Sequence, residues 1–300
     1  MKKIFKWIGI VLGSIIGLVV VAVITFFLIG NAALNKTYDF PPSNLTIPTD
    51  EGSIEHGKHI ADTLCRDCHG QDLGGDVMLD DPMMGILDAP NLTAGEGGVG
   101  LEFTSDEDYV RAIRHGIDPE GKPIFMPAVY ATSRLGDEDL GDIIAYLKTL
   151  PPVDNTTRGL QLKPLAKILM GADQFPKLPV EVVSHEIHVT APERDVSIEY
   201  GDYLVHTNGC QDCHGNELAG AEYPDPTVQL ITPNITPGGE VGFWSEDDFI
   251  NTIRTGVAPS GHQLNGDHMP WETFKLLTDD ELKAIYMYLQ SLPKLKQYTE

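Results

Sequence analysis

The sequence has few basic residues for its length. Lysine and arginine together number 21, against 44 aspartates and glutamates, so the 300 residues carry a formal net charge of -23. A chain this acidic is poorly suited to bind nucleic acid or an anionic lipid surface, so neither partner is expected. The excess of acid either serves solubility or provides a docking surface for a basic protein, because complementary charge raises the rate of encounter.

Cysteine is also scarce, and its four copies lie in two similar motifs. Residues 65–69 read CRDCH and residues 210–214 read CQDCH. The C-x-x-C-H pattern marks covalent attachment of a c-type haem, in which each thiol forms a thioether to a vinyl group and the histidine becomes the proximal iron ligand. A redox dithiol or half of a zinc site fits less well, because histidine follows both pairs and no cysteine is left over. The sequence therefore predicts two covalently bound haem c groups on Cys65, Cys68, His69, Cys210, Cys213 and His214.

One apolar run, at the N-terminus, is long enough to cross a bilayer. Residues 7–30 contain no charged side chain and follow Lys2, Lys3 and Lys6. A cleaved signal peptide usually has a shorter apolar core, although the small residues at 31–33 would allow cleavage. We expect an uncleaved anchor whose lysine-bearing end stays in the cytoplasm, which places the rest of the chain on the outer side of the membrane.

The rest of the chain is dominated by two copies of one unit, at residues 53–152 and 197–293. Each copy has a capped helix before the cysteine motif, a P-N-[LI]-T segment, a helix ending in I-R-x-G, and a last helix with apolar periodicity that is stopped by proline. Each unit is therefore expected to be mainly α-helical with long loops, as a large prosthetic group would require.

These features predict five segments. They are a transmembrane anchor at 1–30, a proline-rich tether at 31–52, a first domain at 53–152, an interdomain segment at 153–195 and a second domain at 196–300. The interdomain segment is too apolar for a free linker, so we expect it to pack against one or both domains. It has a short helical pattern near residues 160–170 and some strand character near residues 180–189.

The second axial position of each iron is assigned from the repeat. Met126-Pro127 and Met269-Pro270 occupy matching places between the middle and last helices, 57 and 55 residues after the two motif histidines. Methionine ligation favours electron transfer over substrate binding, whereas the alternative role is to fill a gap in the core. The competing side chains are Met78, Met83, Met84 and His115 in the first unit and Met287, His262 and His268 in the second. The predicted iron ligands are His69 with Met126 and His214 with Met269.

Two other pairs of residues invite a functional interpretation. Arg114 and Arg254 repeat in register and could bind haem propionates in a bidentate manner, or could form salt bridges with local acids. His185 and His188 have a spacing that suggests a metal site, but no matching ligands surround them in the sequence. We interpret this pair as ordinary surface residues.

Taken together, the motifs resemble the class I cytochrome c domains found in multihaem subunits of bacterial membrane-bound alcohol and gluconate dehydrogenases. The resemblance covers residues 53–152 and 197–295 and is carried by C-x-x-C-H, P-N-[LI]-T, I-R-x-G and M-P in that order. It implies two tandem class I cytochrome c domains with His/Met haems. It also implies single-electron transfer at the periplasmic side of a bacterial cytoplasmic membrane.

The leading hypothesis is a single-pass, membrane-anchored dihaem cytochrome that carries electrons between redox proteins. Its partners would be a dehydrogenase or quinol-linked complex and another cytochrome or oxidase, and it would have no catalytic residues and no small-molecule substrate. The rival is a haem enzyme, peroxidase-like or thiosulfate-oxidising, which needs one iron with a labile distal site. Two repeated Met-Pro sites argue against that rival. A haem-dependent sensor or structural subunit is a third hypothesis, which the sequence neither supports nor excludes.

Overall fold

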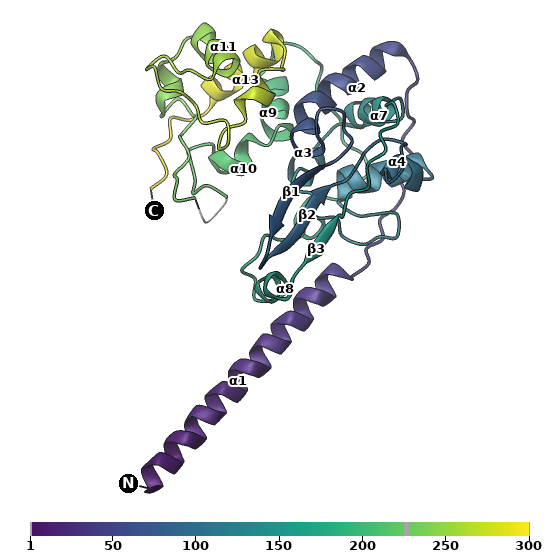
Figure 1. Ribbon diagram of the computed structural model, residues 1–300. Coiled ribbons are helices and arrows are strands. Elements are labelled where there is room, and N and C mark those ends of the chain that lie inside the picture. Colours follow the sequence, from purple (N-terminus) through teal and green to yellow (C-terminus); the bar gives the residue numbers. More distant parts are fainter. Residues whose placement is uncertain (1, 225–227, 300) are drawn as a thin grey trace.

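The computed structural model describes residues 2–224 and 228–299. Two helical lobes lie at one end of a long helix that projects away from them (Figure 1). The long helix is α1 (Lys2–Leu34). None of its most apolar window is buried by the rest of the protein, and its large apolar side chains from Ile4 to Ile29 are mostly exposed. The mainly α fold with a long apolar N-terminal helix is confirmed.

The first lobe forms around two helices that cross at a glycine. Its elements are α2 (Glu51–Leu64), α3 (Arg66–His69), β1 (Asp76–Asp81), β2 (Gly85–Ala89), α4 (Val99–Glu102), α5 (Asp106–Val110), the π-helical turn η1 (Arg111–His115), α6 (Val129–Thr132) and α7 (Asp137–Leu147). Helices α2 and α7 cross closely at Gly57, where a Cβ would lie 1.8 Å from the carbonyl oxygen of Asp142. Only glycine permits this approach.

The second lobe repeats the arrangement. Its elements are α9 (Ile198–Thr207), α10 (Cys210–His214), the 3-10 turn η3 (Glu240–Phe243), α11 (Glu246–Thr255), α12 (Trp271–Phe274) and α13 (Asp279–Ser291). Helices α9 and α13 cross at Gly201, which matches Gly57, and a Cβ there would lie 2.0 Å from the carbonyl oxygen of Ala284. The glycine that follows the S-I-E motif in both copies is therefore a packing requirement.

Helix ends follow the local sequence closely. Ser245 begins α11 with a complete capping box, in which its hydroxyl accepts from the Asp248 N–H at 3.2 Å and its own N–H donates to the Asp248 carboxylate at 2.9 Å. The equivalent helices end at Gly116 and Gly256, both in the left-handed conformation. The helix before the first cysteine motif starts earlier than expected, because Asp50 rather than Ser53 accepts the capping hydrogen bond.

The segment expected to be a tether instead lies against the first lobe. Residues 31–34 extend α1, and the chain that follows is tied down by a hydrogen bond from the Tyr38 N–H to Gly121 O at 2.8 Å. Leu45 and Ile47 pack on the core of the first lobe. Apolar residues between the prolines explain the difference, because they bury surface that a free tether would leave exposed.

The interdomain segment also packs mostly on the first lobe. It contains β3 (Leu160–Leu162), α8 (Pro164–Gly171) and the 3-10 turn η2 (Pro179–Glu181). Strand β3 pairs antiparallel with β2 and completes a sheet of order β1-β2-β3. The expected short helix is present, although it begins at Pro164, and residues 180–189 form no strand.

Candidate functional site

The first cysteine motif forms a short helix directly after α2, and its histidine is buried. His69 donates from Nδ1 to the carbonyl oxygen of Pro90 at 2.8 Å. Burial lowers the pKa of His69, and the bond to Pro90 only partly opposes this. The imidazole is therefore neutral, with Nε2 left as the nitrogen that can bind iron.

The second motif reproduces this geometry. His214 donates from Nδ1 to the carbonyl oxygen of Pro233, again at 2.8 Å, and burial again lowers its pKa. Metal-binding histidines commonly have the other ring nitrogen fixed by a carbonyl or carboxylate in this way. The matching bonds indicate that both histidines are oriented for the same task.

The P-N-[LI]-T segment provides the carbonyl that orients each histidine. In the first domain the side-chain oxygen of Asn91 accepts from the N–H and the hydroxyl of Thr93 at 2.9 and 2.8 Å, while its amide donates to Val153 O at 2.6 Å. Asn234 and Thr236 repeat the turn with bonds of 2.8 and 2.7 Å. The repeat of this segment was visible in the sequence, but its role in holding the histidine was not, because that role depends on contacts between distant residues.

The two cysteine pairs have similar environments. All are free of disulfides and half-buried. Burial, followed by nearby negative groups, raises the pKa of Cys65 and of Cys210 to about 12, and burial also raises the pKa of Cys68 and Cys213. These thiols are protonated at neutral pH, which disfavours a reactive redox dithiol. Two thiols beside a histidine with a free Nε2 are the groups that covalent haem requires. The donor set therefore fits covalent haem, which would supply an iron that cycles between two oxidation states.

The two proposed distal methionines lie in matching places in the fold. Met126 precedes α6, and Met269 precedes α12; both side chains are half-buried. Met269 packs on the same apolar cluster as Cys210. Of the competitors, Met78 and Met83 are exposed on the β1–β2 hairpin and Met287 is exposed on α13, so they are poorly placed as buried ligands. Ligation by Met126 and Met269 stays a prediction.

The repeated arginines contact local acids. Arg114 is fully buried and bonds to Asp137 at 2.9 Å and to the carbonyl oxygens of Leu135 and Ile187 at 2.8 and 2.9 Å. Arg254 bonds to Asp279 at 2.7 Å. Both arginines thus form salt bridges with local acids, one of the two roles expected from the sequence. Propionate binding by either arginine stays a prediction.

The remaining candidate histidines lie in different environments. His115 is buried, pairs with His185 between their Nδ1 atoms at 3.2 Å, and stacks on Phe40. His188 instead binds Asp137 at 2.8 Å, so His185 and His188 point to different partners and do not form a shared site. His262 is exposed and His268 half-buried in the loop before Met269.

The two domains contact each other in a reciprocal way, near the candidate methionine of one domain and the cysteine motif of the other. Helix α6, just after Met126, contacts α9, which leads into the second cysteine motif. Helix α12, just after Met269, contacts α2, which leads into the first motif. A Cβ at Gly209 would lie 3.7 Å from the Cβ of Ala131, and the charge of Arg134 opposes the burial that raises the pKa of Asp212. The segment that follows each candidate methionine therefore lies against the helix that precedes the other domain's cysteine motif.

Polar contacts strengthen this junction. His59 on α2 binds both carboxylate oxygens of Glu281 on α13 at 3.0 and 2.9 Å. Tyr203 on α9 donates its hydroxyl to Asp139 at 2.5 Å and accepts from the Gly136 N–H at 2.9 Å. These residues were not singled out in the sequence, because nothing in their local pattern indicates a partner in the other domain.

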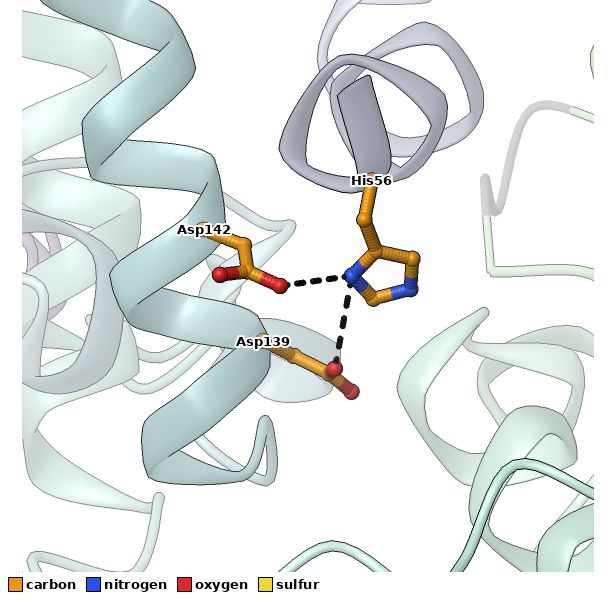
Figure 2. Close-up of side chains that lie close together, drawn as sticks. All are labelled: His56, Asp139 and Asp142. Atoms are coloured by element: carbon orange, nitrogen blue, oxygen red, sulfur yellow. Dashed lines mark hydrogen bonds and ion pairs between the residues drawn. The ribbon is translucent and has the colours of Figure 1, made fainter. Parts of the chain in front are cut away.

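A histidine and two aspartates gather beside this junction (Figure 2). His56 Nδ1 lies 2.8 Å from Asp142 and 3.8 Å from Asp139. Ligating atoms this close could hold a metal ion, but the Arg194 guanidinium already lies 3.0 Å from Asp139 and 3.3 Å from Asp142. The cluster therefore works as a polar network that ties the end of the interdomain segment, at Arg194, to α7.

Comparisons with known proteins agree with this geometry. The family model described as cytochrome c matches residues 54–151 and 198–293. The cytochrome c subunit of the quinone alcohol dehydrogenase of Gluconacetobacter polyoxogenes is 28% identical over 89% of this chain and 60% of its own length. The gluconate 2-dehydrogenase cytochrome c subunit of Pantoea cypripedii is 24% identical over 81% of this chain and 60% of its own length.

Another relative is matched over a larger share of its own length. The dihaem c-type cytochrome of Cereibacter sphaeroides is 28% identical over 74% of this chain and 76% of its own length. The chain thus spans about 60% of the dehydrogenase subunits and most of the dihaem protein. These relatives are electron-transfer components rather than enzymes in their own right. This chain therefore belongs to the cytochrome c family and has two cytochrome c domains that carry covalently bound haem c.

Proposed function

We propose that this protein is a membrane-anchored dihaem electron carrier, whose two domains work on the periplasmic side of a bacterial cytoplasmic membrane. It would pass single electrons from a dehydrogenase to a further cytochrome or an oxidase. The observation that carries the proposal is the duplication of the complete site. Each domain has a neutral histidine fixed by a proline carbonyl and a half-buried methionine in the matching place.

Closed coordination at both irons supports a carrier over a haem enzyme. His/Met ligation leaves no free position for a peroxide or a sulfur substrate and favours rapid exchange of single electrons. The protein's part in such a reaction is to bind the haems, to hold both axial ligands in place during the redox change, and to keep the iron away from water. The carbonyl bonds to Nδ1 hold the histidine ligands, because they fix the imidazole plane and tautomer.

A dehydrogenase partner is supported by the similarity of this chain to cytochrome c subunits of alcohol and gluconate dehydrogenases. Membrane attachment is supported by α1, whose apolar side chains are left uncovered by the protein. The lysines at its N-terminal end favour retention of that end in the cytoplasm, which would place both domains outside.

The experiment that tests the function is purification of the intact haem-loaded protein from membranes in mild detergent. We expect low-spin spectra for both haems, no carbon monoxide binding in the native state, and a dehydrogenase that copurifies. Binding of carbon monoxide to one haem would instead indicate a labile iron and would favour the haem enzyme. Recovery of the protein from the soluble fraction after alkaline washing of membranes would disprove the anchor.

A further inference from the structure

The end of α1 does not hang free above the lobes but is clamped by α8. The two helices cross at a pair of glycines, with Gly30 in α1 and Gly171 in α8. A Cβ at Gly30 would lie 2.0 Å from the carbonyl oxygen of Lys167, and a Cβ at Gly171 would lie 1.9 Å from that of Phe26. Close approach of two backbones at small residues is how helices pack without an aqueous driving force.

The clamp is continuous with the first domain. Ala33 and Leu34 of α1 and Met170 of α8 pack on the same small core cluster, which also includes Phe125, the neighbour of Met126. The Lys167 ammonium donates to the Asn31 side chain at 2.8 Å. The helix α1, the helix α8 and the first domain therefore form one packed body.

The position of α8 along α1 sets the level at which this body meets lipid. The 20 residues from Trp7 to Phe26 span about 30 Å at about 1.5 Å per residue, which matches the hydrocarbon thickness of a bilayer. Gly171 lies beside Phe26, and Lys167 reaches Asn31. Helix α8 lies beside residues 26–31, at the outer end of the apolar run, which would place it near the lipid headgroups when α1 spans the bilayer.

The surface of α8 away from α1 is apolar. At helical spacing, Leu165, Ile168 and Leu169 lie on one side of α8, and all three are only partly buried. The turn that follows is polar, with Asp173 and Lys177 paired at 2.7 Å. An apolar face bordered by charged residues is the pattern of a helix that lies at a membrane surface.

The tip of the β1–β2 hairpin adjoins the start of α8. The Lys163 N–H donates to Met84 O at 3.0 Å, and its ammonium donates to Pro82 O at 2.9 Å. The Asp81 carboxylate accepts from the backbone of Met83 and Met84, which fixes the turn. Met83 itself is 64% exposed, so a large apolar side chain projects from the tip next to α8.

Resting on the proposed anchor, we propose that α8 and the Pro82–Met84 tip form a second membrane contact. This contact is the lipid seat, defined as residues 82–84 and 164–171, and its ligand is the headgroup and upper acyl region of a bilayer. Lys163 and Lys167 keep their charge, but their ammonium groups are directed to Pro82 O and to the Asn31 side chain, and that of Lys177 to Asp173. The contact therefore relies mainly on apolar burial rather than on anionic lipid. The first domain is thereby held in one orientation on the membrane.

The test uses the full-length, haem-loaded protein in nanodiscs of phosphatidylcholine that contain some phosphatidylcholine with a photoreactive diazirine high in one acyl chain. After illumination, peptide mass spectrometry locates the lipid adducts. We expect adducts on α1 and on both parts of the lipid seat, with the same pattern when anionic phosphatidylglycerol is added. Adducts confined to α1 would overturn the lipid seat while preserving the anchor, and a lack of adducts on α1 would reject the anchor itself.

A matched pair of variants gives an independent measurement. Because haem attachment consumes the four native cysteines, Met83→Cys and Ser260→Cys would each carry a single free thiol. Both positions are exposed in the protein, and Ser260 lies in the second domain. In nanodiscs, a membrane-impermeant maleimide should label the thiol at position 83 several-fold more slowly than the one at 260. Equal rates would overturn the proposal.

Discussion

The two domains differ little near the cysteine motifs and greatly at their outer surfaces. Both have the 2.8 Å bond from histidine to a proline carbonyl. Leu73 and Leu218, which follow the motifs, even share the rare left-handed backbone with φ of 58° and 57°. A leucine adopts this conformation only where its surroundings enforce it, so the two loops are held in one specific shape.

The outer surfaces differ because only the first domain is wrapped. Residues 35–50 and much of residues 153–189 lie on it, together with α1 and α8. Arg114 accordingly has no exposed side-chain surface and bonds to Ile187 of the interdomain segment, whereas the Arg254 side chain is 29% exposed. The contacts found in both domains orient the motif histidines. The contacts found only in the first domain attach it to α1 and to the interdomain segment.

Removal of one cysteine pair should have the largest effect on this comparison. We expect Cys65→Ala with Cys68→Ala, or Cys210→Ala with Cys213→Ala, to halve the covalent haem content, because each domain binds its own group. The pyridine haemochrome assay and the intact mass measure this loss. A pair whose replacement leaves the haem content unchanged would not be an attachment site.

Replacement of a distal methionine should affect one domain at a time. Met126→Ala or Met269→Ala should lower the potential of its own haem, by a sizeable part of the ~0.8 V range that axial ligands control, and should allow carbon monoxide to bind. Redox titration with spectroscopy measures both changes. Met287→Ala, at an exposed position, is the control. An unchanged spectrum in Met269→Ala would assign the ligand elsewhere.

The two arginines should differ in what they contribute to stability. Arg114→Leu leaves Asp137 without its buried partner and should cost about 3 kcal/mol of unfolding free energy, the low end for such pairs because Asp137 remains partly exposed. Arg254→Leu breaks a more exposed pair and should cost at most about 1 kcal/mol. Denaturant unfolding measures both values. A change in haem potential with unchanged stability would instead support propionate binding.

The smallest expected effect concerns the pH dependence of the domain junction. The hydrogen bond to Glu281 raises the pKa of His59 despite burial. Burial disfavours the Glu281 carboxylate, but the bond and charge of His59 overcome this and lower its pKa. The pair therefore stabilises the junction fully below about pH 6.5, the pKa of a free histidine, and loses this contribution as the pH rises through the raised pKa.

Stabilisation by this pair should also fade at low pH, once Glu281 is protonated. Unfolding free energy measured against pH should show this window in the native protein and a flatter profile in His59→Gln. Identical profiles would indicate that the contact between His59 and Glu281 contributes nothing. Lys148→Gln, which removes an exposed charge that does not act on His59, is the matched control.

The sequence predicted features that depend on short-range patterns. The cysteine motifs and the glycines that end the I-R-x-G helices, Gly116 and Gly256, are each encoded within a few residues. The sequence could not predict that residues 31–52 pack on the first domain, that residues 160–162 join a sheet or that residues 180–189 form no strand. Each of these outcomes depends on tertiary contacts, which override local propensity and leave no periodic signal.

The same limit applies to the candidate site. Histidine ligation follows from adjacency to the cysteines, but the proline carbonyls that fix His69 and His214 lie 21 and 19 residues away. The partners of Arg114 and Arg254 lie at the start of the last helix of each domain. From the sequence, each arginine could bind either a haem propionate or a nearby Asp or Glu. Only the three-dimensional distances show that Asp137 and Asp279 are in reach.

The crossed contact between α6 and α9, and between α12 and α2, has a consequence for how the protein can be divided. In each domain, the short helix after the candidate methionine packs against a helix of the other domain. A cut between the domains would therefore not release two self-sufficient cytochromes, since each would expose the flank of its own methionine segment to water. Separated domains should therefore be less stable than the two domains together.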